Sequence, residues 1–203
     1  MKLKNKIAII TGGGKGIGKE ISLGLAKEGA KIIIADLDKE NSSNVVETII
    51  QNGGDAIYVE TNVSSEQSVK NLITKSINKF NQIDILINNA GIRHVKKLED
   101  HNLNDWNDMI SVNLTGPYIC CQAVIPQMKK IGKGKIINFG SIASFMGRPD
   151  RVGYVAAKSG VLGLTRALAI DLKGTNINVN TICPGLISTP FNKKYAEDPT
   201  HGE

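Results

Sequence analysis

Short apolar runs alternate with amphipathic segments along almost the whole chain. The apolar runs are rich in isoleucine, valine and alanine, and they cover residues 6–10, 31–35, 56–60, 83–87, 135–139 and 177–182. Such a run is typical of a strand that is buried on both faces of a sheet. Between the runs the apolar positions have helical spacing, which predicts helices ending near Gly29 and Leu172 and helices over residues 39–51, 65–79 and 103–130, the last broken near Gly116-Pro117.

Strands that alternate with helices predict an α/β fold, a doubly wound parallel sheet with helices on both faces and right-handed crossovers. In such a sheet ligands bind beyond the C-terminal ends of the strands, near the point where the strand order reverses. Every unusual motif of this chain follows the end of a predicted strand. We therefore expect these motifs to form one site in one domain.

The composition narrows the classes of protein that fit this pattern. A chain of 203 residues with 41% hydrophobic and 22% charged residues is ordinary for one globular domain. Its apolar runs are too short for a signal peptide or a membrane span, so we expect a cytoplasmic protein without a membrane partner. Three cysteines, Cys120, Cys121 and Cys183, form no disulfide framework, and we expect free thiols in a reducing compartment.

The net charge of +6 does not mark a nucleic-acid binder, because the lysines are scattered and aromatic residues make up only 4% of the chain. The histidines have no metal-ligand spacing, so we expect no metal site. A small-molecule ligand remains the expected partner.

A glycine-rich turn, Thr11-Gly-Gly-Gly-Lys-Gly-Ile-Gly18, follows the first predicted strand. Its spacing is neither the common dinucleotide fingerprint nor a P-loop. Glycines nevertheless let the backbone approach a diphosphate, and the next helix offers free N–H groups at its positive end. A purely structural turn is the alternative interpretation.

Asp36, at the end of the second strand, favours NAD, because its carboxylate can accept hydrogen bonds from ribose hydroxyls and would repel a 2′-phosphate. Lys15 favours NADP instead, since its cation could bind that phosphate. We give Asp36 more weight because it is expected at the ribose itself.

The stretch Tyr154-Val-Ala-Ala-Lys158 places a phenol and an ammonium one helical turn apart on the same face. A free phenol titrates near pH ~10, and a fixed cation beside it lowers that pKa. The pair can therefore act as a general acid and base. An ordinary surface pair is the alternative on spacing alone.

The motifs in their order resemble the short-chain dehydrogenase/reductase family, including its sugar and polyol dehydrogenases and its 3-oxoacyl-carrier-protein reductases. They are the glycine-rich turn, Asn88-Asn-Ala-Gly91, Asn113, Ser141, Tyr154-Val-Ala-Ala-Lys158 and Pro184-Gly185, and the resemblance extends from residue 6 to about residue 189. It implies one NAD(P)-binding Rossmann-type domain over residues 1–203.

The resemblance also implies roles for individual residues. Tyr154 would be the acid and base, and Lys158 would lower its pKa and bind the nicotinamide ribose. Ser141 would hold the substrate oxygen, and Asn113 would anchor a water in a proton path. The implied cofactor contacts, besides Tyr154 and Lys158, are Gly12, Gly14, Lys15, Gly16, Ile17, Gly18, Asp36, Asn62, Val63, Asn89, Ala90, Gly91, Pro184, Gly185, Ile187 and Thr189.

The chain departs from the family pattern in two places. Asn62 stands where an aspartate is more usual, which keeps the carbonyl acceptor and loses the charge. The sequence also ends early, so we expect the last strand to be missing, the edge at residues 177–182 to be bare, and residues 190–203 to begin a segment over the substrate pocket. We expect a homodimer through the helices around residues 103–130 and 153–172, with tetramer formation impaired.

Three functions therefore stay open. The first is NAD-dependent interconversion of a secondary alcohol and a ketone, on a sugar or polyol. The second is NADPH-dependent reduction of a 3-oxoacyl-carrier protein. The third is dinucleotide binding by a catalytically impaired fragment.

Overall fold

Six parallel strands form the centre of the fold in the computed structural model, which describes residues 1–192. They are β1 (Ile7–Thr11), β2 (Lys31–Asp36), β3 (Ala56–Glu60), β4 (Ile85–Asn88), β5 (Gly134–Phe139) and β6 (Ile177–Ile182). Their order in the sheet is β3-β2-β1-β4-β5-β6, and every neighbouring pair is parallel. The predicted doubly wound parallel sheet is therefore confirmed, with β6 at one edge of the described sheet.

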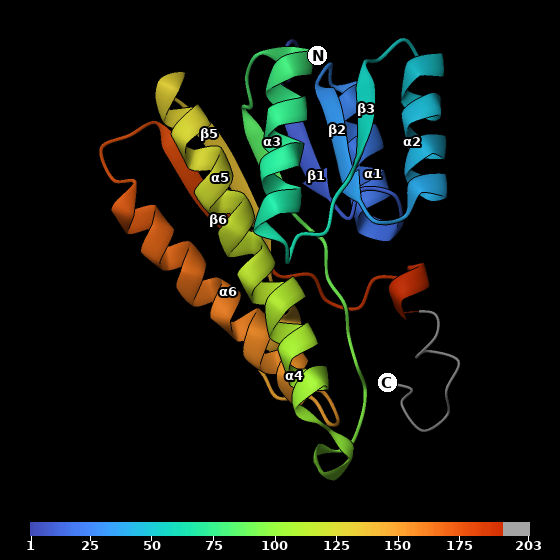
Figure 1. The fold of residues 1–203 in the computed structure, drawn as a ribbon, viewed down its shortest axis with the longest axis vertical. Helices are drawn as coiled ribbons and strands as arrows, with labels where there is room; N and C mark the ends of the chain where they lie inside the picture. Colours follow the sequence, from blue (N-terminus) through green and yellow to red (C-terminus); the bar gives the residue numbers. More distant parts are fainter. Residues whose placement is uncertain (193–203) are drawn as a thin grey trace.

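Helices cover both faces of this sheet (Figure 1). One face carries α1 (Gly16–Lys27) and α2 (Lys39–Gln51), whose apolar side chains pack on alternate residues of the central strands. The other face carries α3 (Glu66–Phe80), α5 (Gly116–Lys130) and α6 (Val152–Asp171). Since both faces are covered, the central strands are apolar at nearly every position, which explains the continuous runs in the sequence.

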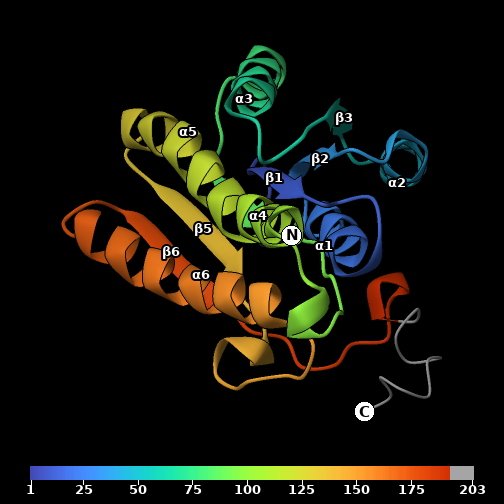
Figure 2. The same cartoon turned by 60° about the horizontal axis from the view of Figure 1, so that its bottom comes forward.

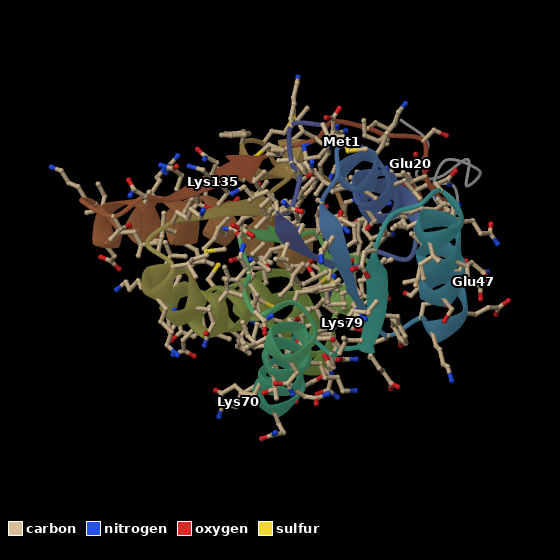
Figure 3. All side chains as sticks on the ribbon, turned by 90° about the horizontal axis from the view of Figure 1, so that it is seen from above. Met1, Glu20, Glu47, Lys70, Lys79 and Lys135 are labelled. Atoms are coloured by element: carbon tan, nitrogen blue, oxygen red, sulfur yellow. The ribbon has the colours of Figure 1, made fainter. Side chains whose placement is uncertain are left out.

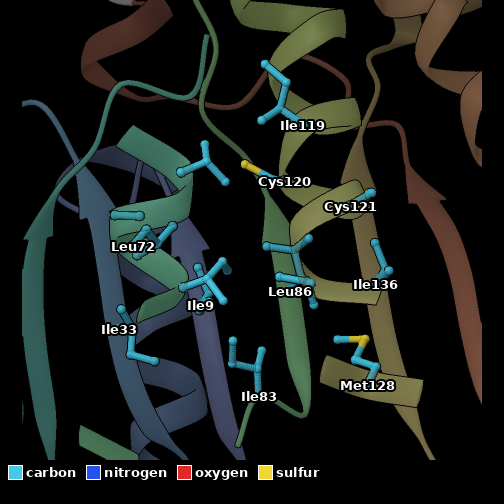
Figure 4. Packing of buried hydrophobic residues seen from close by; sticks show 14 of the residues in the cluster. Ile9, Ile33, Leu72, Ile83, Leu86, Ile119, Cys120, Cys121, Met128 and Ile136 are labelled. Atoms are coloured by element: carbon cyan, nitrogen blue, oxygen red, sulfur yellow. The ribbon is translucent and has the colours of Figure 1, made fainter. Parts of the chain in front are cut away.

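The core on the second face is built from aliphatic and sulfur-containing side chains (Figure 4). Leu72 of α3 and Met128 of α5 are completely buried against Ile9 and Leu86 of the sheet. Cys120 and Cys121 lie in the same cluster as free thiols, and burial raises the pKa of both. The expected free thiols are thus confirmed, and these two remain protonated near neutral pH.

The predicted break near Gly116-Pro117 is wrong in its form, because the backbone stays helical from α4 (Leu103–Ile110) into α5. The irregularity lies just before it, in a π-helical turn over Ser111–Thr115. Pro117, in the first turn of α5, follows this irregular turn and supplies no backbone N–H to it. Gly116 is needed for packing, since a Cβ there would lie 2.9 Å from Val63 Cγ2.

The strand order reverses between β1 and β4, which lie side by side and continue into loops on opposite sides. The loops after β1, β4, β5 and β6 gather at the C-terminal edge of the sheet, which comes forward in Figure 2. Thr189, in the segment after β6, lies against the turn after β1, within 3.5 Å of a Cβ placed at Gly16. Four segments that are distant in sequence therefore meet at this edge.

Charged side chains lie around the outside of the molecule (Figure 3). Lys70, Lys79 and Lys135 are exposed at separate points of the surface, in agreement with the scattered lysines of the sequence. Within the described part of the chain, no helix combines the length and the apolar character needed to cross a membrane.

Candidate active site

A cavity of about 1000 Å³ lies at the C-terminal edge of the sheet. This volume is at the upper end of the range for small-molecule sites. The predicted site residues that line it are Gly12, Lys15, Gly16, Ile17, Asp36, Asn62, Val63, Asn89, Ala90, Gly91, Asn113, Ser141, Tyr154, Lys158, Pro184, Gly185, Ile187 and Thr189. Gly14 and Gly18 do not line the cavity. They belong to the glycine-rich turn that forms one of its walls. Residues 193–203 of the predicted lid segment lie outside the described residues.

The glycine-rich turn is held against the loop after β4. Asn89 donates both of its amide hydrogens, to the carbonyls of Thr11 and Gly12 at 3.0 Å each. Thr11 Oγ1 accepts the backbone N–H groups of Asn89 and Ala90, also at 3.0 Å. A Cβ at Gly18 would lie 2.0 Å from the carbonyl oxygen of Gly12, so only glycine permits this close approach. The turn is therefore a rigid wall of backbone at the start of α1.

At one end of the cavity, Asp36 braces the turn. Its Oδ2 accepts the N–H of Gly14, and its Oδ1 accepts the N–H of Asp38, both at 3.0 Å. Lys15 Nζ forms an ion pair with Asp38 at 2.6 Å, and the hydrogen bond from Lys15 lowers the pKa of Asp38 to about 2. This end thus carries two carboxylates and one cation, and the cation is already engaged by Asp38.

At the other end, Ser141 is placed by a short 3₁₀ helix after β5, over Ile142–Ser144. Its Oγ accepts the N–H of Ala143 at 3.1 Å, and its own N–H donates to Ser144 Oγ at 3.1 Å. Ser144 Oγ in turn donates to the carbonyl of Lys158 at 2.7 Å. One serine hydroxyl therefore links the Ser141 backbone to α6, the helix that carries Tyr154.

Tyr154 and Lys158 lie on the buried face of α6, with exposed fractions of 9% and 5%. Lys158 Nζ donates to the carbonyl of Phe139 at 2.7 Å and lies 5.9 Å from the centre of the Tyr154 ring. Burial lowers the pKa of Lys158 to about 8. The side chain is therefore a cation at neutral pH with a labile proton.

The pKa of Tyr154 shifts in the direction opposite to the lowering expected from Lys158. Burial raises the pKa of Tyr154, because the phenolate is poorly solvated inside the protein. A hydrogen bond from Ser141 and the positive charges of Arg93 and Arg151 act in the opposite direction. The prediction used only the spacing of Tyr154 and Lys158 and left out desolvation, which has the largest effect on the Tyr154 pKa.

Asn113 is completely buried in the π-helical turn and ties that turn to the loop after β4. Its Oδ1 accepts the N–H of Ile92 at 3.2 Å, and its amide donates to the carbonyls of Ile92 and Met109 at 3.0 Å each. A Cβ at Gly91 would come within 2.8 Å of Asn113 Oδ1, so the glycine is required here. Its predicted role as the anchor of a water stays a prediction.

Several residues of the site were missed from the sequence. Asp38 and Ser144 matter only through their partners, although the spacing of Ser141 and Ser144 matches a capping box. Three arginines, Arg93, Arg148 and Arg151, also line the cavity. None of the three was among the predicted site residues, although Arg148 lies in a Gly-Arg-Pro stretch that contributes to the family resemblance.

The glycine-rich turn and the start of α1 form a wall of the cavity that fits a dinucleotide. The N-cap of α1, Lys15, makes no side-chain hydrogen bond to the helix, so the first N–H groups of α1 can bind a diphosphate. The Asp36 carboxylate lies where an adenosine ribose would follow, and Tyr154 and Lys158 lie at the far end of the same cavity. The arrangement can hold a long anionic cofactor with an acid and base beside its reactive end.

Comparisons with known proteins agree with this geometry. The family model for short chain dehydrogenase matches residues 6–200. An uncharacterized oxidoreductase of Thermotoga maritima is 41% identical over 192 residues, which cover 95% of this chain and 75% of that protein. A 3-oxoacyl-[acyl-carrier-protein] reductase of Synechocystis sp. is 39% identical over 198 residues, covering 97% and 80%. The crystal structure of gox2181 has a TM-score of 0.95 at 33% identity and covers 98% of this chain and 79% of that chain.

Proposed function

The chain belongs to the short-chain dehydrogenase family of NAD(P)-dependent oxidoreductases, which act on CH–OH and keto groups, and we propose that it interconverts a secondary alcohol of the sugar or polyol type and its ketone with NAD. One observation carries the proposal. A single cavity joins the Asp36 carboxylate at one end to Ser141, Tyr154 and Lys158 at the other. It therefore combines a ribose-binding group with an acid and base.

In the proposed mechanism, the Tyr154 phenol gives its proton to the alkoxide oxygen during reduction. Oxidation is the reverse step and starts from the phenolate, which burial disfavours in this structure. Ser141 holds the substrate oxygen and stabilises the charge that develops on it. Lys158 supplies a positive charge beside the phenol and binds the nicotinamide ribose. When bound, NAD(P) accepts or supplies the hydride. Asn113 positions the loop after β4 and the π-helical turn around these groups.

The ion pair between Lys15 and Asp38 supports NAD over NADP. Lys15 is the cation at the ribose end of the cavity, and Asp38 holds it at 2.6 Å. A 2′-phosphate would have to compete with this carboxylate and would also face Asp36.

Reduction of 3-oxoacyl-carrier protein is the second candidate, and the likeness to the Synechocystis reductase favours it. A chain that binds dinucleotide without turnover is the third.

We expect the wild-type chain to bind NADH at least about tenfold more tightly than NADPH, and Asp36→Ala to reduce this preference by on the order of tenfold, about 1.4 kcal/mol. Asp36→Ala removes a hydrogen-bond acceptor for the ribose hydroxyls and a negative charge that repels the 2′-phosphate. Fluorescence titration of both cofactors measures the ratio. Glu47→Ala, which removes an exposed carboxylate of α2, is the matched control. Binding of neither cofactor to the wild type would contradict the proposed function, and an unmoved ratio would contradict the role of Asp36.

We also propose a homodimer through α5 and α6. Both helices expose apolar side chains, with exposed fractions of 47% for Tyr118 and 72% for Ile170. We expect sedimentation velocity to show a dimer that Ile170→Glu converts largely to monomer, because the new charge would be buried without a partner. Ile50→Glu, at an exposed position of α2, should leave the dimer intact. A monomeric or stably tetrameric wild type would contradict this arrangement.

A further inference from the structure

Ser141 lies where the chain of β5 extends past the end of its neighbour β4. The pairing between these two strands ends at Asn138. Along a strand between two parallel neighbours, the backbone N–H groups point to the two sides alternately. Gly140 and Ile142 donate to backbone carbonyls on the side of β6, at 2.9 and 3.0 Å. The N–H of Ser141 therefore points to the other side, where β4 has already ended.

The hydroxyl of Ser144 takes the place of a strand as the partner of this N–H. Ser144 Oγ accepts the Ser141 N–H at 3.1 Å and donates its own hydrogen to the carbonyl of Lys158 at 2.7 Å. A serine hydroxyl has one hydrogen to donate and lone pairs to accept, so both bonds form at the same time. The backbone N–H of Ser144 also donates to the carbonyl of Ser141 at 2.9 Å. One residue therefore holds both polar backbone groups of Ser141.

The link reaches α6 at the residue that carries the buried ammonium. Lys158 lies one helical turn after Tyr154, and its Nζ donates to the carbonyl of Phe139, the last residue of β5, at 2.7 Å. The backbone and the side chain of Lys158 are thus both tied to the segment that leads to Ser141. The side chains of Ser141 and Tyr154 are hydrogen-bonded to each other, so the spacing of β5 and α6 sets how these two hydroxyls meet.

We propose that Ser144 is a positioning residue for the reaction, whose hydroxyl holds Ser141 at the distance and angle from Tyr154 at which both hydroxyls meet the same substrate oxygen. This inference rests on the roles of Ser141 and Tyr154 in the proposed function. Ser144 is not among the described residues that line the cavity, so it acts through Ser141. A displacement of about 1 Å at a reacting group can lower a rate by ~10²-fold, which gives one hydrogen bond at this place a large effect on turnover.

Removal of the hydroxyl tests the proposal. The assays are oxidation of D-sorbitol, xylitol and ribitol with NAD⁺ and reduction of ethyl acetoacetate with NADH or NADPH, and the best substrate of the wild type serves for the variants. We expect Ser144→Ala to lower kcat by about tenfold or more, because Ser141 loses its hold. The Kd for NADH should stay within about twofold, since the glycine-rich turn and Asp36 are untouched. Ser144→Thr keeps a hydroxyl and should retain kcat within about threefold.

Ser159 provides the matched control. Its Oγ donates to the carbonyl of Ser144 at 3.3 Å, so it joins α6 to the same 3₁₀ helix without involving Ser141. Ser159→Ala should leave kcat within about twofold of the wild type. Urea unfolding of each variant verifies that it is folded in the assay. If Ser144→Ala does not fold, Ser144→Cys replaces it, because a thiol fills the same space and hydrogen-bonds only weakly.

A double-variant cycle identifies the residue through which Ser144 acts. If Ser144 acts through Ser141, Ser144→Ala should lower kcat by no more than about twofold further in a Ser141→Ala background. A role in the packing of α6 alone would give the same fold-loss in both backgrounds. Equal losses in the two backgrounds, or an unchanged kcat in Ser144→Ala, would overturn the inference and leave the proposed function standing.

The failure of the proposed function has a different signature. If the wild type turns over none of these compounds, the proposed reaction fails, and the hold on Ser141 is measured directly as the exchange rate of its amide hydrogen by NMR. We expect Ser144→Ala to raise this rate by about tenfold or more and Ser159→Ala to leave it unchanged. The same exchange rate in the wild type and in Ser144→Ala would overturn the inference.

Discussion

Tyr154→Phe is expected to lower kcat by ~10²–10⁴-fold while the affinity for NADH stays nearly unchanged. The substitution removes only the hydroxyl of a side chain that is 9% exposed, so the ring keeps its packing beside Met109 and Ala143. The reaction loses the group that moves the hydroxyl proton. Steady-state rates and a fluorescence titration of NADH measure the two quantities.

A second tyrosine provides the control for this experiment. Tyr118 is 47% exposed on α5, and its hydroxyl accepts a hydrogen bond from Gln122 at 3.2 Å. Tyr118→Phe should leave both kcat and the NADH affinity unaltered. If Tyr154→Phe retained the wild-type rate, the assignment of Tyr154 as the acid and base would be wrong.

Lys158→Met should also abolish most of the turnover, and in addition it should change how stability depends on pH. Burial lowers the pKa of Lys158 from 10.5 to about 8 in the folded protein. Between these two values the unfolded chain binds more protons at this residue than the folded chain does, so the wild type gains stability as pH rises. Below pH 8 the buried charge costs on the order of 3 kcal/mol, and this cost disappears near pH 10.

The measurement is the difference in unfolding free energy between Lys158→Met and the wild type. Urea titrations at pH 7 and pH 10 give this difference, in which the other titrating groups largely cancel. Relative to the wild type, the variant should be more stable at pH 7 than at pH 10. The lost hydrogen bond to the Phe139 carbonyl offsets part of the gain at both values, by about 1 kcal/mol. A difference that does not change with pH would mean that Lys158 titrates normally in the folded protein. Lys133→Met, in an exposed turn, should show no such dependence.

The predicted elements agree closely with the structure because their signals are local. The expected strand over residues 177–182 is β6 (Ile177–Ile182), and the expected helix over residues 39–51 is α2 (Lys39–Gln51). Apolar periodicity, a cap such as Ser65 and a terminal glycine such as Gly29 act within a few residues of each other. The break at Gly116 was misjudged for the opposite reason. Its glycine is required by Val63, a contact that spans more than fifty positions of sequence.

Most of the site residues that were predicted from the sequence lie together in the structure. The cavity brings together eighteen of the twenty predicted residues, because they lie in the loops that follow the strands or in the helices next to those loops, and the ends of parallel strands meet at one edge. Asp38 and Ser144 were missed because each acts through a partner on another segment. The arginines were missed because no local pattern distinguishes an arginine that faces a cavity from one that faces solvent.

The sequence by itself determined the α/β class, the strands and helices, and the identity of the groups that can move a proton or approach a diphosphate. These properties depend on residue type and short-range spacing. Only the tertiary structure decided the direction of the Tyr154 and Lys158 pKa shifts, the engagement of Lys15 by Asp38, and the placement of three arginines in the lining of the cavity. Burial and charge act through space, and the folded chain alone defines which groups are close and which are shielded from water.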